Sequence, residues 1–163
     1  MKQVPVAYQL YSAREEVAKD MNGVLKGLKE MGYDGVEFAG FFGYSAQQVK
    51  DMLEANGLVA VSSHVPVQSI ENDMFGTIAY HQAIGCKYIA VPYLDDGHRP
   101  GTPGFADMIQ LIYKFGRLCK EAGIQLLYHN HDFEFVQLSG MYGLDFLYAA
   151  VPPCTLKTEI DVC

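Results

Sequence analysis

The stretch that decides the fold is IQLLYHNHDFEF, residues 124–135. Its apolar first half leads into two histidines and two carboxylates within six residues, the densest group of candidate catalytic or metal-binding side chains in the sequence. Such a pattern predicts a short buried strand whose polar groups gather where the strand ends, at one edge of a sheet. We interpret the rest of the chain as a scaffold that repeats around this strand.

The alternation of a strand with a helix recurs along the whole chain. Runs rich in β-forming residues predict six strands, over residues 4–11, 35–39, 59–64, 87–92, 124–131 and 155–162. Helices are expected between them, with capping boxes at Ser12–Glu15 and Ser45–Gln48, one continuous helix over about 69–84 and a short helix over 144–149. Because parallel neighbours need a crossover helix, this order predicts an α/β fold with parallel strands.

Two architectures fit the alternation: a doubly wound open sheet, or part of a (βα)8 TIM barrel with about five to six βα units. No glycine-rich nucleotide-binding motif follows any predicted strand, which weakens the open-sheet alternative. A barrel brings the carboxyl ends of its strands to one pocket, whereas an open sheet spreads them. The polar residues near predicted strand ends therefore favour the barrel: Gln9, Glu37, His64, His129, His131 and Asp161.

Composition narrows the class of protein. The chain has 163 residues, half of them hydrophobic, and a formal charge of −7, which predicts one soluble globular domain over residues 1–163. The acidic balance argues against nucleic acid as a partner. No apolar run reaches the ~20 residues of a membrane span, and the N-terminus lacks the layout of a signal peptide. The four cysteines are scattered, so we expect reduced thiols in a cytoplasmic protein.

Four motifs resemble one family. They are GYDGVE at 32–37, SSHVP at 62–66, YHNHDFEF at 128–135 and EIDV at 159–162. Together they resemble the sugar phosphate isomerase/epimerase family, the xylose isomerase-like TIM barrels of the AP endonuclease 2 superfamily. The resemblance implies an eight-stranded barrel, a divalent metal (Mn, Zn, Mg or Co) at the carboxyl ends of the strands, and a small sugar or sugar phosphate as substrate. Against that pattern this chain is expected to be truncated in strand six.

The candidate metal ligands lie on the fifth and sixth predicted strands. His129 and His131 are two residues apart, so both are expected on the same face of a strand. The resemblance assigns Asp161 as a ligand from the next strand. Glu159, two residues earlier on the same face, is expected to ligate the metal or to orient a histidine. The alternative is a pair of hydrogen-bonded interior histidines beside a strand-end carboxylate.

Other candidates have a plain structural alternative. Glu134 is expected as a general acid or base, or else as a loop carboxylate facing solvent. Glu37, a lone carboxylate in an apolar strand, is expected as a general base or substrate ligand, or else in a structural ion pair. We expect His64, Gln9 and Tyr8 to bind substrate, or else His64 to be a hydrogen-bonded buried histidine and Tyr8 to pack in the interior. His81 and His98 are expected at the surface.

Two functions remain open at this stage. The first is a member of a metal-dependent sugar (phosphate) isomerase/epimerase lineage, which moves a proton through an enediolate in the full barrel. The second is a catalytically inactive partial barrel that self-associates. Because six strands cannot close an eight-stranded barrel, the outer strands are expected to be open edges, and we expect a homodimer or a higher homo-oligomer.

Overall fold

The computed structural model describes residues 4–162 of the chain and contains a six-stranded sheet. The strand order is β1-β2-β3-β4-β5-β8, and the ladders β1–β2, β2–β3 and β5–β8 are parallel. Each strand of the sheet therefore neighbours the next one along the chain, with no reversal of direction in the order. Doubly wound sheets contain such a reversal and barrels do not. The order thus confirms the expected α/β partial barrel and removes the open-sheet alternative.

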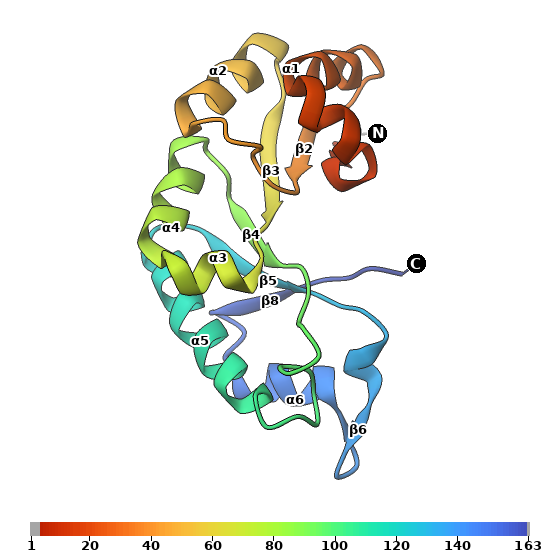
Figure 1. The fold of residues 1–163 in the computed structure, drawn as a ribbon, viewed down its shortest axis with the longest axis vertical. Coiled ribbons are helices and arrows are strands. Elements are labelled where there is room, and N and C mark those ends of the chain that lie inside the picture. Colours follow the sequence, from red (N-terminus) through yellow and green to blue (C-terminus); the bar gives the residue numbers. More distant parts are fainter. Residues whose placement is uncertain (1–3, 163) are drawn as a thin grey trace. The chain divides into compact units, whose positions relative to one another are not determined.

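The elements follow the expected alternation (Figure 1). The strands of the sheet are β1 (Ala7–Gln9), β2 (Gly35–Phe38), β3 (Val59–His64), β4 (Tyr88–Val91), β5 (Gln125–His129) and β8 (Leu156–Glu159). The α-helices are α1 (Arg14–Glu30), α2 (Ala46–Asn56), α3 (Val67–Asn72), α4 (Met74–Ala83), α5 (Phe105–Glu121) and α6 (Gly143–Ala150). Two 3-10 helices, η1 (Leu10–Ala13) and η2 (Phe133–Phe135), follow β1 and β5.

The described residues form two compact units. The N-terminal unit comprises residues 4–64 and 79–88, and the C-terminal unit comprises residues 65–78 and 89–162. Each unit has a hydrophobic core of its own. In the N-terminal unit, α1 and α2 pack against β2 and β3, with Phe38 and Met21 completely buried.

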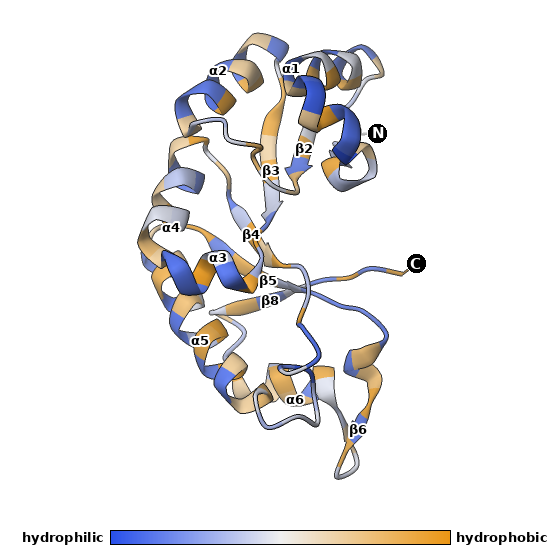
Figure 2. Cartoon of the chain, in the orientation of Figure 1, coloured by the Kyte–Doolittle hydropathy of each residue, from blue (hydrophilic) through white to orange (hydrophobic). Residues whose placement is uncertain are grey.

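The C-terminal unit is organised around α5. This helix runs beside β5 and β8 in Figure 1 and buries Phe115 and Ile112 against Leu126 and Leu156 of those strands. Figure 2 shows hydrophilic and hydrophobic segments alternating around α1, α2 and α5. That alternation is typical of helices that bury one face and expose the other.

One extra residue interrupts the ladder between β2 and β3. Val36 pairs with Ala60, but Glu37 pairs with Ser62, so Val61 has no partner position on β2. Before this β-bulge the two strands approach closely: a Cβ on Gly35 would lie 2.7 Å from the carbonyl oxygen of Val59. The bulge sets which side chains Glu37 meets.

Two aspartates interrupt helices that the sequence predicts to be continuous. Asp20 lies inside α1 with φ −152° and ψ 83°, and Asp73 separates α3 from α4 with φ −157° and ψ 87°. Each carboxylate accepts a hydrogen bond from the backbone N–H three residues later, at Gly23 (2.9 Å) and at Gly76 (2.8 Å). The expected single helix over 69–84 is therefore wrong, because Asp73 caps a new helix inside it.

Other local expectations also need correction. The capping box at Ser45 is present, but the one at Ser12 is not, because the helical turn already begins at Leu10, where the side chain of Gln9 caps it. A hairpin of β6 (Gln137–Leu138) and β7 (Met141–Tyr142) was not expected. The strands β1, β5 and β8 are shorter than predicted. His81 is buried beside Phe41 rather than exposed.

Within the described residues, none of the helices is both long enough and apolar enough to cross a membrane.

Candidate functional site

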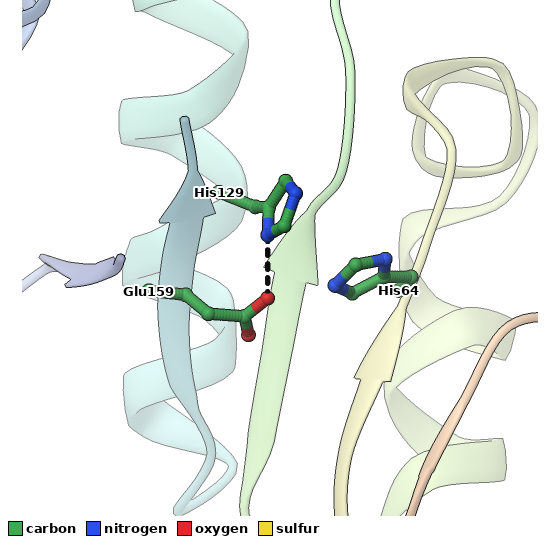
Figure 3. A group of neighbouring side chains, drawn as sticks. All are labelled: His64, His129 and Glu159. Carbon is green, nitrogen blue, oxygen red and sulfur yellow. Dashed lines mark hydrogen bonds and ion pairs between the residues drawn. The ribbon is translucent and has the colours of Figure 1, made fainter. Parts of the chain in front are cut away.

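The imidazole of His129 lies between two carboxylates of the C-terminal unit. The parallel ladder places the last residue of β5, His129, opposite the last residue of β8, Glu159. His129 Nδ1 is 2.8 Å from Glu159 Oε1, and His129 Nε2 is 3.4 Å from Asp161 Oδ2. Figure 3 shows the contact between His129 and Glu159, and it also labels His64 of the N-terminal unit. The side chains of His129, Glu159 and Asp161 are 13%, 20% and 42% exposed, so the group is open to solvent on the side of Asp161.

Asn130 holds the backbone of Asp161. Its side-chain Nδ2 donates to the carbonyl oxygen of Asp161 (3.1 Å), and its Oδ1 accepts from the N–H of Asp161 (3.1 Å). The sequence analysis gave Asn130 no role. The signal was available, because an amide between two histidines at a strand end offers both a donor and an acceptor.

Glu134 is buried in the turn that follows β5. It is 1% exposed, so the alternative of a loop carboxylate facing solvent is wrong. Its Oε1 accepts from the hydroxyl of Tyr128 (2.7 Å), and its Oε2 accepts from the N–H of His131 (2.7 Å). Burial, and then the hydrogen bond to Glu134, raises the pKa of Tyr128 well above its ordinary value, so this hydroxyl stays a donor. Both oxygens of Glu134 are occupied, so acid–base work by this residue requires one of these bonds to open.

The ring of His131 is held by aromatic neighbours. It stacks on Phe133 (centroids 5.3 Å apart, planes at 10°) and meets the edge of Tyr93 (5.4 Å). Its centroid lies 5.1 Å from that of His129, so the structure does bring the two histidines together. Burial lowers the pKa of His131, which favours the neutral imidazole. Neutral imidazole is the form that binds a metal.

Arg99 connects the loop after β4 to the turn after β5. Its guanidinium lies 4.2 Å from the ring centroid of Phe133, its Nε donates to the carbonyl oxygen of Leu94 (3.1 Å), and it pairs with Asp96 (2.7 Å). It also donates to the hydroxyl of Tyr93. Sequence reasoning missed Arg99, because a lone arginine in a loop rich in glycine and proline carries no local signal of these contacts.

A second polar group lies in the N-terminal unit. Glu37 Oε1 is 3.3 Å from His64 Nε2, and Glu37 also accepts a hydrogen bond from the hydroxyl of Ser62. The contact that the structural alternative for Glu37 requires, with His64, is therefore present. The roles of Glu37 and His64 in catalysis and substrate binding stay predictions.

The remaining two candidates have local partners in the same unit. Gln9 accepts from the N–H of Tyr11 (3.0 Å), and Tyr8 packs edge-on against Tyr33 with centroids 5.4 Å apart. Their expected role in substrate binding also stays a prediction.

The donor set around His129 suits a divalent cation. One imidazole and two carboxylates, from the ends of adjacent strands, are the ligand types that Mn²⁺, Zn²⁺ and Co²⁺ accept, and the carboxylates also suit Mg²⁺. Without a cation, both nitrogens of His129 face carboxylate oxygens. An imidazole binds a cation through one nitrogen, so the residues present fit a metal at His129 Nε2 beside Asp161, with Glu159 at Nδ1 orienting the ring.

This chain has the fold of part of a TIM barrel, and the solved structures that are similar to it include xylose isomerase-like TIM barrel proteins. Among solved structures it is similar to a sugar phosphate isomerase/epimerase from Parabacteroides distasonis (22% identity, TM-score 0.84, 97% of this chain and 65% of that one). It is also similar to an AP endonuclease, family 2, from Brucella melitensis (15% identity, TM-score 0.75, 98% and 69%). A third similar structure is a xylose isomerase-like TIM barrel protein from Mycobacterium smegmatis in complex with magnesium (15% identity, TM-score 0.69, 95% and 63%).

These likenesses confirm the expected fold. The chain spans 65% of the length of the P. distasonis protein and 63% of the M. smegmatis protein. No protein-family model matches the sequence, and no curated protein does.

Proposed function

We propose that this chain carries the metal site of a sugar or sugar phosphate isomerase or epimerase. One observation carries the proposal: the imidazole of His129 has a carboxylate oxygen at each ring nitrogen, from Glu159 at 2.8 Å and from Asp161 at 3.4 Å. The similar structures support it, because they include a protein described as a sugar phosphate isomerase/epimerase and a protein in complex with magnesium.

Each residue of the group has a separate task in this proposal. His129 supplies the Nε2 donor and Asp161 a carboxylate on the open side, while Glu159, which is largely sheltered from solvent, orients the ring through Nδ1. A divalent cation held there would stabilise the negative charge of an enediolate formed from the sugar.

The reaction also needs a base beside the carbon next to the carbonyl group. Two carboxylates are expected for this role, and the first is Glu37 of the N-terminal unit, whose side chain is 17% exposed and has His64 and Ser62 as partners. Glu134 is buried, and both its oxygens accept hydrogen bonds in the turn after β5. Partly buried carboxylates are suited to proton transfer when a partner tunes them.

Metal binding is the first test. The purified chain is stripped with a chelator, loaded with Mn²⁺ or Co²⁺, and run in sedimentation velocity with metal content read on the same peak. We expect one cation per chain, on a dimer or larger species, and no stoichiometric cation in His129→Ala. His98→Ala is a matched control, because His98 also pairs with a carboxylate (Asp95, 2.8 Å) in the same unit. A wild-type chain without cation would refute the metal site and would favour the alternative of an inactive, self-associating scaffold.

Proton exchange is the test of the chemistry. A panel of aldoses, ketoses and their phosphates is incubated with the metal-loaded chain in D₂O, and deuterium at the carbon next to the carbonyl is followed by NMR. Exchange that depends on the cation and is lost in Glu37→Gln supports an isomerase or epimerase with Glu37 as base. Cation-dependent exchange that survives in Glu37→Gln assigns the base to another residue.

A further inference from the structure

Asp161 lies two residues beyond Glu159, which is the last residue of β8 in its ladder with β5. The last pair of that ladder is His129 with Glu159. After His129 the chain leaves the sheet, because the N–H of His131 turns to Glu134 and the 3-10 helix η2 begins at Phe133. The β5 backbone thus supplies no further ladder pair for Asp161.

The side chain of Asn130 takes the place of that missing pair. It donates to the carbonyl oxygen of Asp161 and accepts from its N–H, both at 3.1 Å. A carboxamide has one donor and one acceptor side by side, as a peptide group has, so it can continue a ladder by one step. Both backbone groups of Asp161 are fixed in this way by one side chain.

We infer that Asn130 is a positioning residue, which places the carboxylate of Asp161 on the open side of the metal site. The inference rests on the proposed function. Its physical content is that fixing the backbone of Asp161 restricts where its carboxylate can lie, and in this structure Asp161 Oδ2 is 3.4 Å from His129 Nε2. Residues that orient metal ligands typically contribute about 10–100-fold to metal affinity.

The test is a double-mutant cycle on Co²⁺ affinity, with Asn130→Ala, Asp161→Ala and the double variant. If Asn130 acts through Asp161, each single variant weakens Co²⁺ binding by about 10–100-fold, and the double variant is no weaker than Asp161→Ala. The visible spectrum of bound Co²⁺ is expected to change in the same way in Asn130→Ala and Asp161→Ala. A loss of packing alone would not change this spectrum.

Asn130→Asp separates the two hydrogen bonds. The carboxylate keeps an acceptor for the N–H of Asp161 but cannot donate to its carbonyl oxygen. We expect faster exchange of the amide proton of Asp161 in Asn130→Ala than in Asn130→Asp, and slowest exchange in the wild type.

The outcomes separate two failures. If wild type binds Co²⁺ and Asn130→Ala binds it equally well with an unchanged spectrum, the role of Asn130 is refuted and the metal site stands. If the fold-losses in Co²⁺ affinity of the two single variants multiply in the double variant, the role of Asn130 is also refuted, because the two residues then act independently. If wild type and His129→Ala both fail to bind Co²⁺, the metal site itself is refuted, and the role of Asn130 with it.

Discussion

Replacing Tyr128 by phenylalanine removes one hydroxyl from the interior of the C-terminal unit and leaves the ring in place. Tyr128 is completely buried, and its hydroxyl donates at 2.7 Å to Glu134, which is 1% exposed. A hydrogen bond to a charged group contributes about 1.5–3 kcal/mol, and a buried carboxylate that loses a donor costs a similar amount. We therefore expect the free energy of unfolding to fall by about 1.5–3 kcal/mol in Tyr128→Phe.

Urea denaturation, followed by circular dichroism, measures this loss. Tyr113→Phe is the matched control: Tyr113 is 37% exposed on α5, and its change is expected to stay within about 0.5 kcal/mol. A loss under about 0.5 kcal/mol in Tyr128→Phe would refute the reasoning, since it would mean that Glu134 does not depend on this donor.

The pH dependence of stability is a second test of this hydrogen bond, and the direction of the change is defined. Burial raises the pKa of Tyr128 above its ordinary value, so the native state keeps this proton while the unfolded chain releases it above pH about 10. Because the unfolded state then binds fewer protons, the stability due to Tyr128 is present below pH about 10 and is lost as the pH rises further. The difference in the free energy of unfolding between wild type and Tyr128→Phe is therefore expected to narrow above pH about 10. A constant difference across this range would contradict the assignment.

Three further changes test other parts of the fold. Asp73→Ala removes the cap of α4 and is expected to cost about 1 kcal/mol in urea denaturation, and an unchanged midpoint would contradict the cap. Gly35→Ala places a Cβ 2.7 Å from a backbone carbonyl and is expected to lower stability by about 1–3 kcal/mol, whereas Gly27→Ala, which meets open space, is expected to raise it by about 0.5–1 kcal/mol. Burial raises the pKa of Cys119 to about 12, whereas hydrogen bonding to Thr155 and Lys120 lowers that of the exposed Cys154. Iodoacetamide with peptide mapping is expected to modify Cys154 first, and equal rates at the two sites would contradict the burial.

The fold could be predicted because its signals are local. Each strand of the sheet is a short run of β-forming residues followed by a helix with one apolar face, and this alternation is readable without knowing any contact. The breaks at Asp20 and Asp73 were missed because the apolar spacing continues across them. Both breaks share the pattern Asp-Met-x-Gly, at 20–23 and 73–76, which was the signal available for an internal cap.

The candidate site was predictable in its residue types and not in its connections. Strand spacing indicated that His129, Glu159 and Asp161 would meet, because residues at the ends of neighbouring strands lie at one edge. The burial of Glu134 could not be read from its position in a loop, since it depends on the hydroxyl of Tyr128 six residues earlier. The hydrogen bonds of Asn130 depend on a backbone 31 residues away.

The unpaired Val61 in β3 also has a consequence for comparing sequences. In a regular strand alternate side chains share one face, so one extra residue puts every later residue out of phase with the same strand of a protein that lacks it. A strand without Val61 would pair Ser62 with Glu37 directly after the pair of Ala60 with Val36, so the residues after the bulge would keep their partners on β2 although each would stand one place earlier in the sequence. The chemistry at the end of this strand is therefore set by a count of residues as much as by their identity. A sequence alignment that forbids gaps inside strands would match the polar end of β3 to the wrong positions of any relative that lacks the bulge.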